Sequence, residues 1–248
     1  MRSSCIPSAL CAIGAMAVVV AGAPGAREAA AKPGRCPPGM ASIGGKFCVD
    51  RYEASTVEIL AHGKTRAHSP FMPVDGLRVK AVSKRGVPPQ AHISRDQAAE
   101  ACKNAGKRLC SDEEWVSACK GSRGAAYPYG DARKGGYCND SGASSFNHYY
   151  GAGAEPPKEA YTWANLNDPR LNQWKGGLAK TGSFRRCRGA AAVFDMVGNL
   201  HEWTANKRGV FRGGYYLDTR INGEGCDYRT TAHAPSYYDY STGFRCCR

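Results

Sequence analysis

Twelve cysteines in 248 residues limit the folds open to this chain more than any other property. Cys5 and Cys11 lie in an apolar N-terminal stretch, so an even number of cysteines, ten, remains downstream. In a chain bound for an oxidising compartment, such a set predicts a disulfide framework. A zinc site is disfavoured, because no C-x-x-C pair occurs and Cys246 and Cys247 are too close together to share a tetrahedral site easily.

The N-terminus has the composition of a secretory signal. Arg2 supplies a positive start, residues 9–22 form a short apolar stretch, and small residues follow it. The alternative is a transmembrane helix. It is disfavoured because about 20 apolar residues are needed to span a bilayer.

We therefore expect three segments along the chain. A signal peptide over 1–26, cut somewhere between 23 and 31, precedes a linker over 27–35 and a single domain over 36–248. The domain is long enough to bury a core of its own. The mature protein would be secreted or periplasmic, without a transmembrane anchor once the signal is removed.

The charge of the chain favours acidic partners. Its formal net charge is +13. A surface of this sign attracts anionic glycans, cell-wall polymers, lipid headgroups or nucleic acid, although solubility alone is the simpler interpretation. Specific nucleic-acid recognition is not expected, because the lysines and arginines are scattered and no motif of that class is present. The partner would be an unknown peptide, protein or glycan, and the charge of the chain favours an acidic one.

Start and stop signals predict two helices. The first runs from a capping box at Ser94 to a glycine stop at Gly106, and the second runs from a capping box at Ser111 to Gly121. Both helices have one face of small or apolar residues, which we expect to be buried. The inward residues would be Ala98, Ala101, Cys102, Ala105, Trp115, Ala118 and Cys119.

The segments around these helices are read from turn residues. Proline and glycine between Cys36 and Cys48 suit a disulfide-closed hairpin, and residues 47–53 have the pattern of a strand. Residues 127–172 are rich in Gly, Asn, Asp, Tyr and Pro and have little periodicity. A loop of this length is usually either functional or disordered.

Five motifs in a fixed order carry a family resemblance. They are AGKRL at 105–109, EEW at 113–115, DMVGNLHEW at 195–203, RGG at 212–214 and GFRC at 243–246. The set resembles the sulfatase-modifying-factor (FGE-sulfatase) domain family, whose named member is the formylglycine-generating enzyme. The resemblance covers about residues 40–246. It implies an α+β, C-type-lectin-like fold that is rich in disulfides, poor in regular secondary structure and ordered in its long loops.

One stretch of the chain offers ligands for calcium. Asp195 and Glu202 flank a glycine-containing turn, and carboxylate and carbonyl oxygens are the hard ligands that calcium prefers. The resemblance implies that the side chains of Asp195 and Glu202 and the carbonyls of Gly198 and Leu200 hold the ion. The alternative is that Glu202 pairs with a nearby arginine.

The resemblance also implies a second calcium site. It begins at Asn165 and Leu166, and Asp168 is the nearest candidate for its acidic ligand.

The family's oxidase centre lacks its thiols in this chain. Formylglycine generation requires two cysteines that bind Cu(I) as thiolates, and soft thiolate ligands select that ion. The resemblance puts the first of these positions at Asp218 and the second within 219–225, where no cysteine occurs. An aspartate cannot replace a Cu(I) thiolate, so copper is not expected.

The disulfide pairs follow in part from the resemblance. It implies that Cys102 pairs with Cys246 and that Cys119 pairs with Cys226, which gives Cys226 a structural role. Proximity favours Cys36 with Cys48, and position beside the first pair favours Cys110 with Cys247. Cys138 and Cys187 then remain, but six cysteines can pair in many ways, and this last assignment stays open.

Tyrosines near the C-terminus could form a ligand groove. The resemblance implies that these segments line the substrate groove, and exposed tyrosines provide large contact area at low entropic cost. Core filling is the alternative. The tyrosines are Tyr215, Tyr216, Tyr237, Tyr238 and Tyr240.

Two classes of function are compatible with these features. The first is a binding or recognition module that keeps the scaffold and has lost the thiol chemistry. The second is an enzyme, either a formylglycine-generating oxidase acting on a sulfatase cysteine or a modified activity that uses Asp218. A thiolate near residue 218 would distinguish the two classes, and the sequence has none there.

Overall fold

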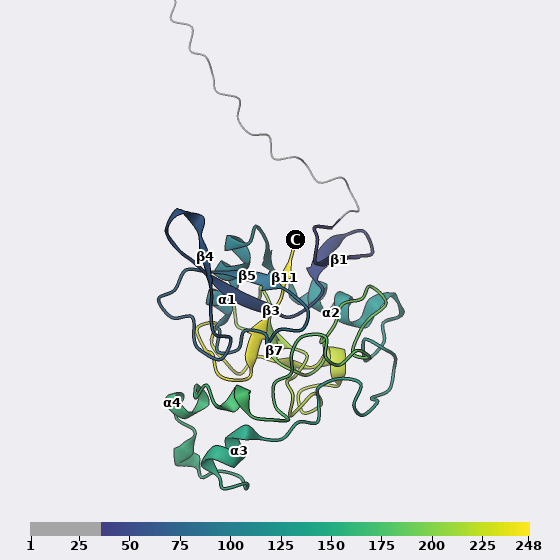
Figure 1. Cartoon of the computed structure of the whole chain (residues 1–248). Helices are drawn as coiled ribbons and strands as arrows, with labels where there is room; N and C mark the ends of the chain where they lie inside the picture. The colour runs from purple at the N-terminus through teal and green to yellow at the C-terminus, as the bar shows by residue number, and fades with distance from the viewer. Residues whose placement is uncertain (1–35) are drawn as a thin grey trace, which may run out of the picture. The chain divides into compact units, whose positions relative to one another are not determined.

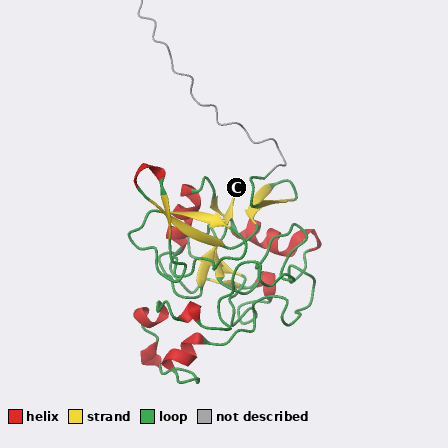
Figure 2. Ribbon diagram, in the orientation of Figure 1, coloured by secondary structure: helices red, strands yellow, loops and turns green. Residues whose placement is uncertain are grey.

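The computed structural model describes residues 36–248, so the predicted signal peptide and linker lie outside the described residues. Short strands, few helices and long loops make up this part of the chain (Figures 1 and 2). The architecture is the α+β arrangement with little regular secondary structure that we expected. Within residues 36–248, no helix combines the length and the apolar character needed to cross a bilayer.

The first sheet brings both ends of the described chain together. Strands β1 (Met40–Ile43) and β2 (Phe47–Asp50) form an antiparallel hairpin at the predicted place, although β2 ends three residues earlier than expected. The sheet continues with β11 (Cys246–Cys247) and β6 (Arg108–Leu109), in the order β1-β2-β11-β6. The C-terminal strand therefore lies between two strands from the first half of the chain.

The second sheet contains the end of the motif DMVGNLHEW over 195–203. Its order is β10-β7-β8-β9, and β7 (His201–Trp203) is the end of that motif. Parallel pairing joins β7 to β10 (Thr242–Phe244) and antiparallel pairing joins it to β8 (Phe211–Arg212). Strand β9 (Arg229–Thr230) completes the sheet. Motifs about 40 residues apart in sequence thus become neighbours.

The third sheet has the order β4-β3-β5. Its strands are β3 (Ala54–Ile59), β4 (Thr65–Ala67) and β5 (Val79–Ser83), all antiparallel. Buried residues of β3 and β5 share one hydrophobic cluster with the apolar face of the first predicted helix.

Both predicted helices are present with the predicted caps. Helix α1 (Arg95–Asn104) begins after Ser94 and α2 (Asp112–Lys120) begins after Ser111, and each has a complete capping box. Their inward faces are buried as expected, with the exception of Ala105, which is only partly buried. The capping side chains satisfy backbone N–H groups that the first helical turn leaves without partners.

The region over 127–172 is ordered and contains short helices that its composition did not predict. Helices α3 (Ser145–Tyr150) and α4 (Trp163–Leu166) lie at the lower left of Figure 1, away from the sheets. Single 3-10 turns supply further local structure in residues 36–248. They are Ala61–Gly63, Gly121–Arg123, Lys158–Ala160, Leu171–Gln173 and Gly225–Asp227.

Five disulfides join the ten cysteines of residues 36–248. All five pairs are the expected ones, including the assignment that sequence left open. They are Cys36–Cys48, Cys102–Cys246, Cys110–Cys247, Cys119–Cys226 and Cys138–Cys187.

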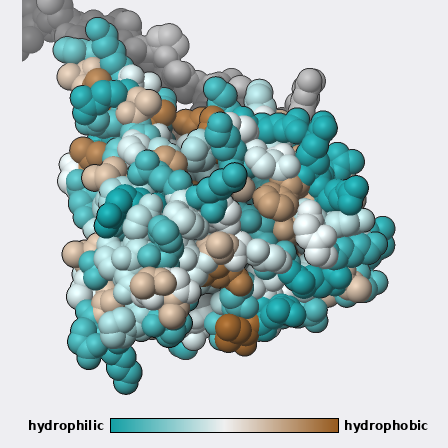
Figure 3. Space-filling view, turned by 60° about the horizontal axis from the view of Figure 1, so that its bottom comes forward, coloured by the Kyte–Doolittle hydropathy of each residue, from teal (hydrophilic) through white to brown (hydrophobic). Residues whose placement is uncertain are grey.

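Within residues 36–248, hydrophobic side chains form three buried clusters, two of which contain disulfides. The third consists of Phe146, Leu171, Tyr216 and Tyr240. The face drawn in Figure 3 is mostly hydrophilic, with hydrophobic residues in small separate groups. Large exposed hydrophobic side chains in the described residues are Leu60, Met72, Leu77, Tyr161, Trp163 and Ile221.

Candidate functional site

Asp218, which the resemblance places at the family's first thiol position, has a structural role. Tyr215 and Asp218 exchange two backbone hydrogen bonds of 2.9 and 3.1 Å across a tight turn. The Oδ1 atom of Asp218 then accepts hydrogen bonds from the backbone N–H groups of Arg220 and Ile221. Gly214 closes the turn at φ +69°, where a Cβ would lie 2.2 Å from the carbonyl oxygen of Asp218. The carboxylate therefore holds the loop that follows it.

No free thiol is available in the part of the chain that the structure describes. Every cysteine over 36–248 is half of a disulfide. Cys226 is fully buried and bonded to Cys119. These residues accordingly provide no pair of thiolates for a Cu(I) ion.

The C-terminal tyrosines mostly fill the interior. Tyr216, Tyr238 and Tyr240 are buried, so these three do not form the exposed contact surface considered for them. The Tyr216 hydroxyl lies 3.1 Å from Ser145 Oγ, and the Tyr238 hydroxyl donates to Asp75. Buried tyrosines normally satisfy the hydroxyl in this way. Core filling is the better interpretation for these three rings.

Part of the aromatic loop remains accessible. Tyr215 and Tyr237 are partly exposed. The Trp163 ring, half of it exposed, packs edge-on against Tyr237 and Tyr238 at 6.0 and 4.6 Å between centroids. An accessible aromatic edge of this kind could contact a sugar or a peptide side chain.

His201 is a neutral, buried residue surrounded by aromatic rings. Its ring lies 4.5 Å from Phe211, 4.8 Å from Tyr215 and 5.5 Å from Tyr228, measured between centroids. Burial, with a smaller contribution from His233, lowers its pKa to about 3. Its Nδ1 atom has no hydrogen-bond partner. An uncharged ring can tolerate this environment, whereas an imidazolium would have to give up its hydration.

Glu202 forms a buried ion pair with Arg245. Two hydrogen bonds, of 2.6 and 2.5 Å, run from the guanidinium to the two carboxylate oxygens, and Trp115 Nε1 adds a third at 2.8 Å. Arg245 also donates to the backbone carbonyls of Asp50 and Phe194. The arginine pair considered for Glu202 is therefore present, and it leaves open whether calcium shares the carboxylate.

Two further carboxylates share this single guanidinium. Glu53 accepts hydrogen bonds from Asn199 Nδ2 and from the backbone N–H of Leu200, and Asp195 accepts one from the backbone N–H of Gly182. Burial, reinforced by repulsion from Asp195 and then Glu202, raises the pKa of Glu53 well above its usual range. Burial likewise raises the pKa of Asp195 to about 7.

The donors at this position fit calcium in charge and in chemistry. Three ionised carboxylates against one guanidinium would leave two negative charges, which one divalent cation could balance. Within residues 36–248, no three His, Cys, Asp or Glu side chains are grouped closely enough to hold a metal by themselves. The predicted site therefore depends on the carbonyls of Gly198 and Leu200 and on calcium sharing Glu202 with Arg245. Calcium here stays a prediction.

The second predicted calcium position has protein partners at each ligand. Asn165 Nδ2 donates to the carbonyl of Ala160, and the Leu166 carbonyl accepts from the backbone N–H of Tyr240. Asp168 is bonded to Arg170 and to the hydroxyl of Tyr150. Arg170 is the main reason that the pKa of Asp168 falls to about 2. Asp168, like Glu202, would have to share its carboxylate with an arginine to bind calcium, so the second site also stays a prediction.

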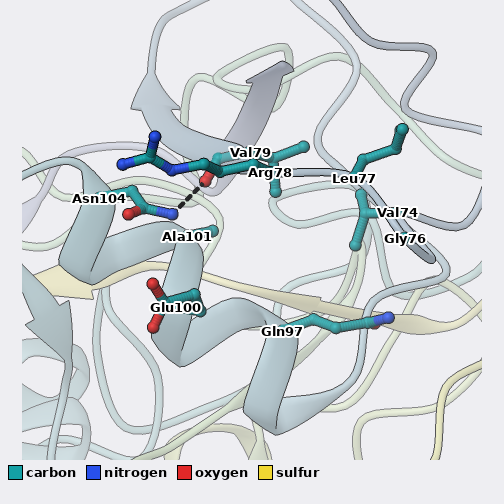
Figure 4. A pocket seen from close by; sticks show the side chains of 9 residues that line it. All are labelled: Val74, Gly76, Leu77, Arg78, Val79, Gln97, Glu100, Ala101 and Asn104. Atoms are coloured by element: carbon teal, nitrogen blue, oxygen red, sulfur yellow. Dashed lines mark hydrogen bonds between the residues drawn. The ribbon is translucent and has the colours of Figure 1, made fainter. Parts of the chain in front are cut away.

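A cavity beside α1 is separate from these residues. It has a volume of about 330 Å³ and lies between the helix and the segment before β5 (Figure 4). Asn104 Nδ2 donates to the carbonyl of Val79 at one side of it, at 2.9 Å. Apolar side chains line most of the remainder, including Val74, Leu77 and Ala101.

Sequence reasoning missed how Glu53, Trp115 and Arg245 surround Glu202. Each lies in a segment that was singled out, as part of the opening strand or of a family motif. Two signals were available in the sequence. Glu53 is an acidic residue at the end of a predicted strand, and Arg245 is a charged residue between Phe244 and Cys246. Their separation in sequence concealed the cluster.

We expect the chelator-treated protein to lose stability as pH rises from about 4 to about 7. Folded Asp195 keeps its proton up to a pKa of about 7, whereas an unfolded aspartate loses it near pH 4. The folded state therefore binds more protons in this window, and the free energy of unfolding falls as pH rises. Calcium at a hundredfold excess over Kd should add about 2.7 kcal/mol at pH 7. Denaturant unfolding curves with and without chelator measure both effects.

Asp195→Asn is the informative variant, because it removes both a titrating group and a ligand. Its pH slope should be shallower and its calcium response lost. Burial also raises the pKa of Asp50, which supplies part of the remaining slope. Asp131→Asn, at an exposed position, should behave like the parent protein. An equal calcium response in Asp195→Asn and the parent would rule out this site.

Comparison with known proteins identifies the family. The family model described as "Sulfatase-modifying factor enzyme 1-like domain" matches residues 11–248. Two curated relatives named "Inactive C-alpha-formylglycine-generating enzyme 2" match over 178 residues. The Bos taurus protein is 25% identical, over 64% of this chain and 49% of its own length. The Mus musculus protein is 24% identical, over 64% and 48%. The chain thus spans about half the length of these relatives.

Solved structures with a related arrangement are distant in sequence. PvdO from Pseudomonas aeruginosa gives a TM-score of 0.47 at 17% identity, covering 88% of this chain and 85% of its own. The Major Tropism Determinant I1 variant gives 0.47 at 14%, covering 86% and 52%. The family model is the stronger result, since it matches nearly the whole chain. On that match, and on the motifs that build the second sheet and the Glu202–Arg245 pair, this protein belongs to the sulfatase-modifying-factor family.

Proposed function

We propose that this family member acts as a binding or recognition module and lacks copper oxidase chemistry. The family resemblance puts Asp218 where the first copper thiolate is required, and the observation that supports the proposal is that its carboxylate accepts hydrogen bonds from the backbone of its own loop. The disulfide pairing supports the same conclusion, because Cys226, the nearest cysteine, is bonded to Cys119. The described residues keep the family fold, but they have no free cysteine thiolates, which are the soft ligands that Cu(I) selects.

The curated relatives support this proposal. Both are named inactive formylglycine-generating enzymes, and we extend the lack of activity to this chain because its own residues offer an independent reason for it. Five disulfides also favour an oxidising compartment, so we propose a secreted or periplasmic location. Calcium bound near Asp195 would stabilise the scaffold and take no part in a reaction.

The ligand that we propose is a peptide, a protein or a glycan. The half-exposed Trp163 ring beside Tyr237 offers one contact surface. Large rings with few rotatable bonds lose little entropy on binding, which suits a recognition surface.

An assay of formylglycine formation tests the proposal. The purified mature protein is incubated with copper, oxygen and a cysteine-containing peptide of the sulfatase motif, and mass spectrometry then measures the aldehyde product. We expect no product above a copper-free control, because the described residues provide no thiolate pair for Cu(I).

Two controls make a negative result informative. A family member with oxidase activity, assayed in parallel, shows that the peptide and the copper are competent. Competition against a Cu(I) chelator then measures whether this protein binds the ion, and no stoichiometric binding is expected. Copper-dependent aldehyde formation by the pure protein would overturn the proposal.

A further inference from the structure

Five arginines line one open groove on this protein. The groove has a volume of about 750 Å³, and no aspartate or glutamate is among its lining residues. The arginines come from three separate segments: the loop after β5, the turn after α2 and the loop around Cys187. They are Arg85, Arg123, Arg185, Arg186 and Arg188.

None of these five guanidinium groups takes part in an ion pair within residues 36–248. Arg133 shows the contrast. It is bonded to the buried carboxylate of Asp140 at 2.7 Å and does not line the groove. Five like charges held together repel each other, and a bound anion would remove that repulsion. The groove therefore has the charge of an anion site, with its donors uncommitted.

Aromatic rings form part of the same groove. Tyr129 and Tyr137 pack against each other with centroids 4.9 Å apart, and Phe194 adds a third ring to the lining. The Arg186 guanidinium lies 5.0 Å from the Tyr137 centroid. Rings beside arginines can stack on the flat face of a sugar while the guanidinium groups bind its charged substituents.

One disulfide fixes two walls of the groove. Cys138 follows Tyr137, Cys187 lies between Arg186 and Arg188, and the bond joins them with 4.7 Å between Cα atoms. Tyr52 stacks on Phe194 from the other side, at 5.1 Å. Because the walls are held in place before a ligand arrives, little ordering is needed on binding.

We propose that this groove binds a sulfated or carboxylated sugar chain. The uncommitted arginines match sulfate or carboxylate groups, and the tyrosine rings match the faces of the sugars. Nucleic acid is the less suitable polyanion, because the chain has no motif of that class and its disulfides favour an extracytoplasmic location. The proposal goes beyond the assignment as a binding module. It also holds whether or not oxidase activity is found, since the groove shares no residue with the Asp218 loop.

The test measures binding of a heparin-derived oligosaccharide of defined length to the full mature protein by titration calorimetry. The triple variant Arg185→Ser, Arg186→Ser, Arg188→Ser removes three charges from the groove. A matched triple variant, Arg78→Ser, Arg208→Ser, Arg220→Ser, removes three exposed arginines elsewhere. We expect the groove variant to weaken binding about tenfold or more and the matched variant to weaken it about twofold.

Two further measurements separate the contribution of the sulfate charges to the affinity from that of stacking on the tyrosine rings. The same oligosaccharide after chemical desulfation should bind far more weakly, and the affinity of the sulfated form should fall as salt rises. Tyr137→Ala should weaken binding severalfold without changing the salt dependence, because it removes a stacking surface and no charge. Circular dichroism and the melting temperature of each variant confirm that it is folded.

Equal losses of affinity in the groove and matched variants would overturn the site, because they would indicate attraction by net charge alone. Tighter binding of a single-stranded oligonucleotide of matched charge would overturn the assignment to sugars. Both outcomes are independent of the copper assay, so failure of this inference and failure of the proposed function can be told apart.

Discussion

Removal of the Cys119–Cys226 disulfide by replacing both cysteines with alanine is expected to lower the free energy of unfolding by about 4 to 5 kcal/mol. The bond closes a segment of 107 residues, and a long loop gains much conformational entropy in the unfolded state when the bond is absent. Denaturant unfolding at neutral pH measures the loss. Aggregation of the variant during expression would be the same effect seen in the cell.

The Cys36–Cys48 disulfide supplies a matched control. It closes only 12 residues, so the double alanine variant should lose about 3 kcal/mol in the same model. A larger loss from the short loop would contradict the entropic explanation.

Thiol labelling of the native protein, followed by peptide mapping, tests the pairing itself. No label is expected on any of the ten cysteines over 36–248. A free thiol at Cys226 would overturn both the pairing and the proposed absence of thiol chemistry.

Replacement of Arg245 by leucine should destabilise the fold by about 3 to 5 kcal/mol. The side chains of Arg245 and Glu202 are 0% and 1% exposed, and Glu53 and Asp195 lie in the same cluster. In chelator-treated protein, loss of the guanidinium would leave three buried carboxylates with no cation, and at least one would have to stay protonated. Urea or guanidinium unfolding curves give the free energy directly.

Arg108→Leu is the matched control for this variant. Arg108 and Glu114 form a similar two-bond pair, but the Arg108 side chain is 51% exposed. Solvent screens an exposed pair, so the loss should be less than about 1 kcal/mol. Comparable losses in the two variants would show that burial does not set the strength of the Arg245 pair.

The local features of this fold could be predicted from sequence because their signals are local. Ser94 and Ser111 cap α1 and α2 through side chains that lie within four residues of their partners. The hairpin over 36–48 is likewise determined by nearby turn residues. The helices α3 and α4 have too few residues to show a periodic pattern, so composition alone indicated a loop.

The acid cluster could not be predicted in the same way. Glu53, Glu202 and Arg245 meet only because β7, β10 and β11 bring distant segments together. The groove arginines show the same limitation: Arg85, Arg123 and Arg186 have no common sequence pattern. Sequence could not say which of the C-terminal tyrosines are buried, because a tyrosine suits a core and a binding surface equally well.

The position of β10 and β11 has a consequence for the order in which the protein is made. β11 lies between β2 and β6, and the same segment carries Arg245 and two disulfide cysteines. Of residues 36–248, this is the last stretch to leave the ribosome. Until this stretch has been made, the sheet β1-β2-β11-β6 lacks its third strand and Glu202 lacks its partner Arg245. Cys102 and Cys110 also lack their disulfide partners. Completion of the fold must therefore wait until this stretch has been made, and a chain cut before residue 243 would remain open and prone to aggregate.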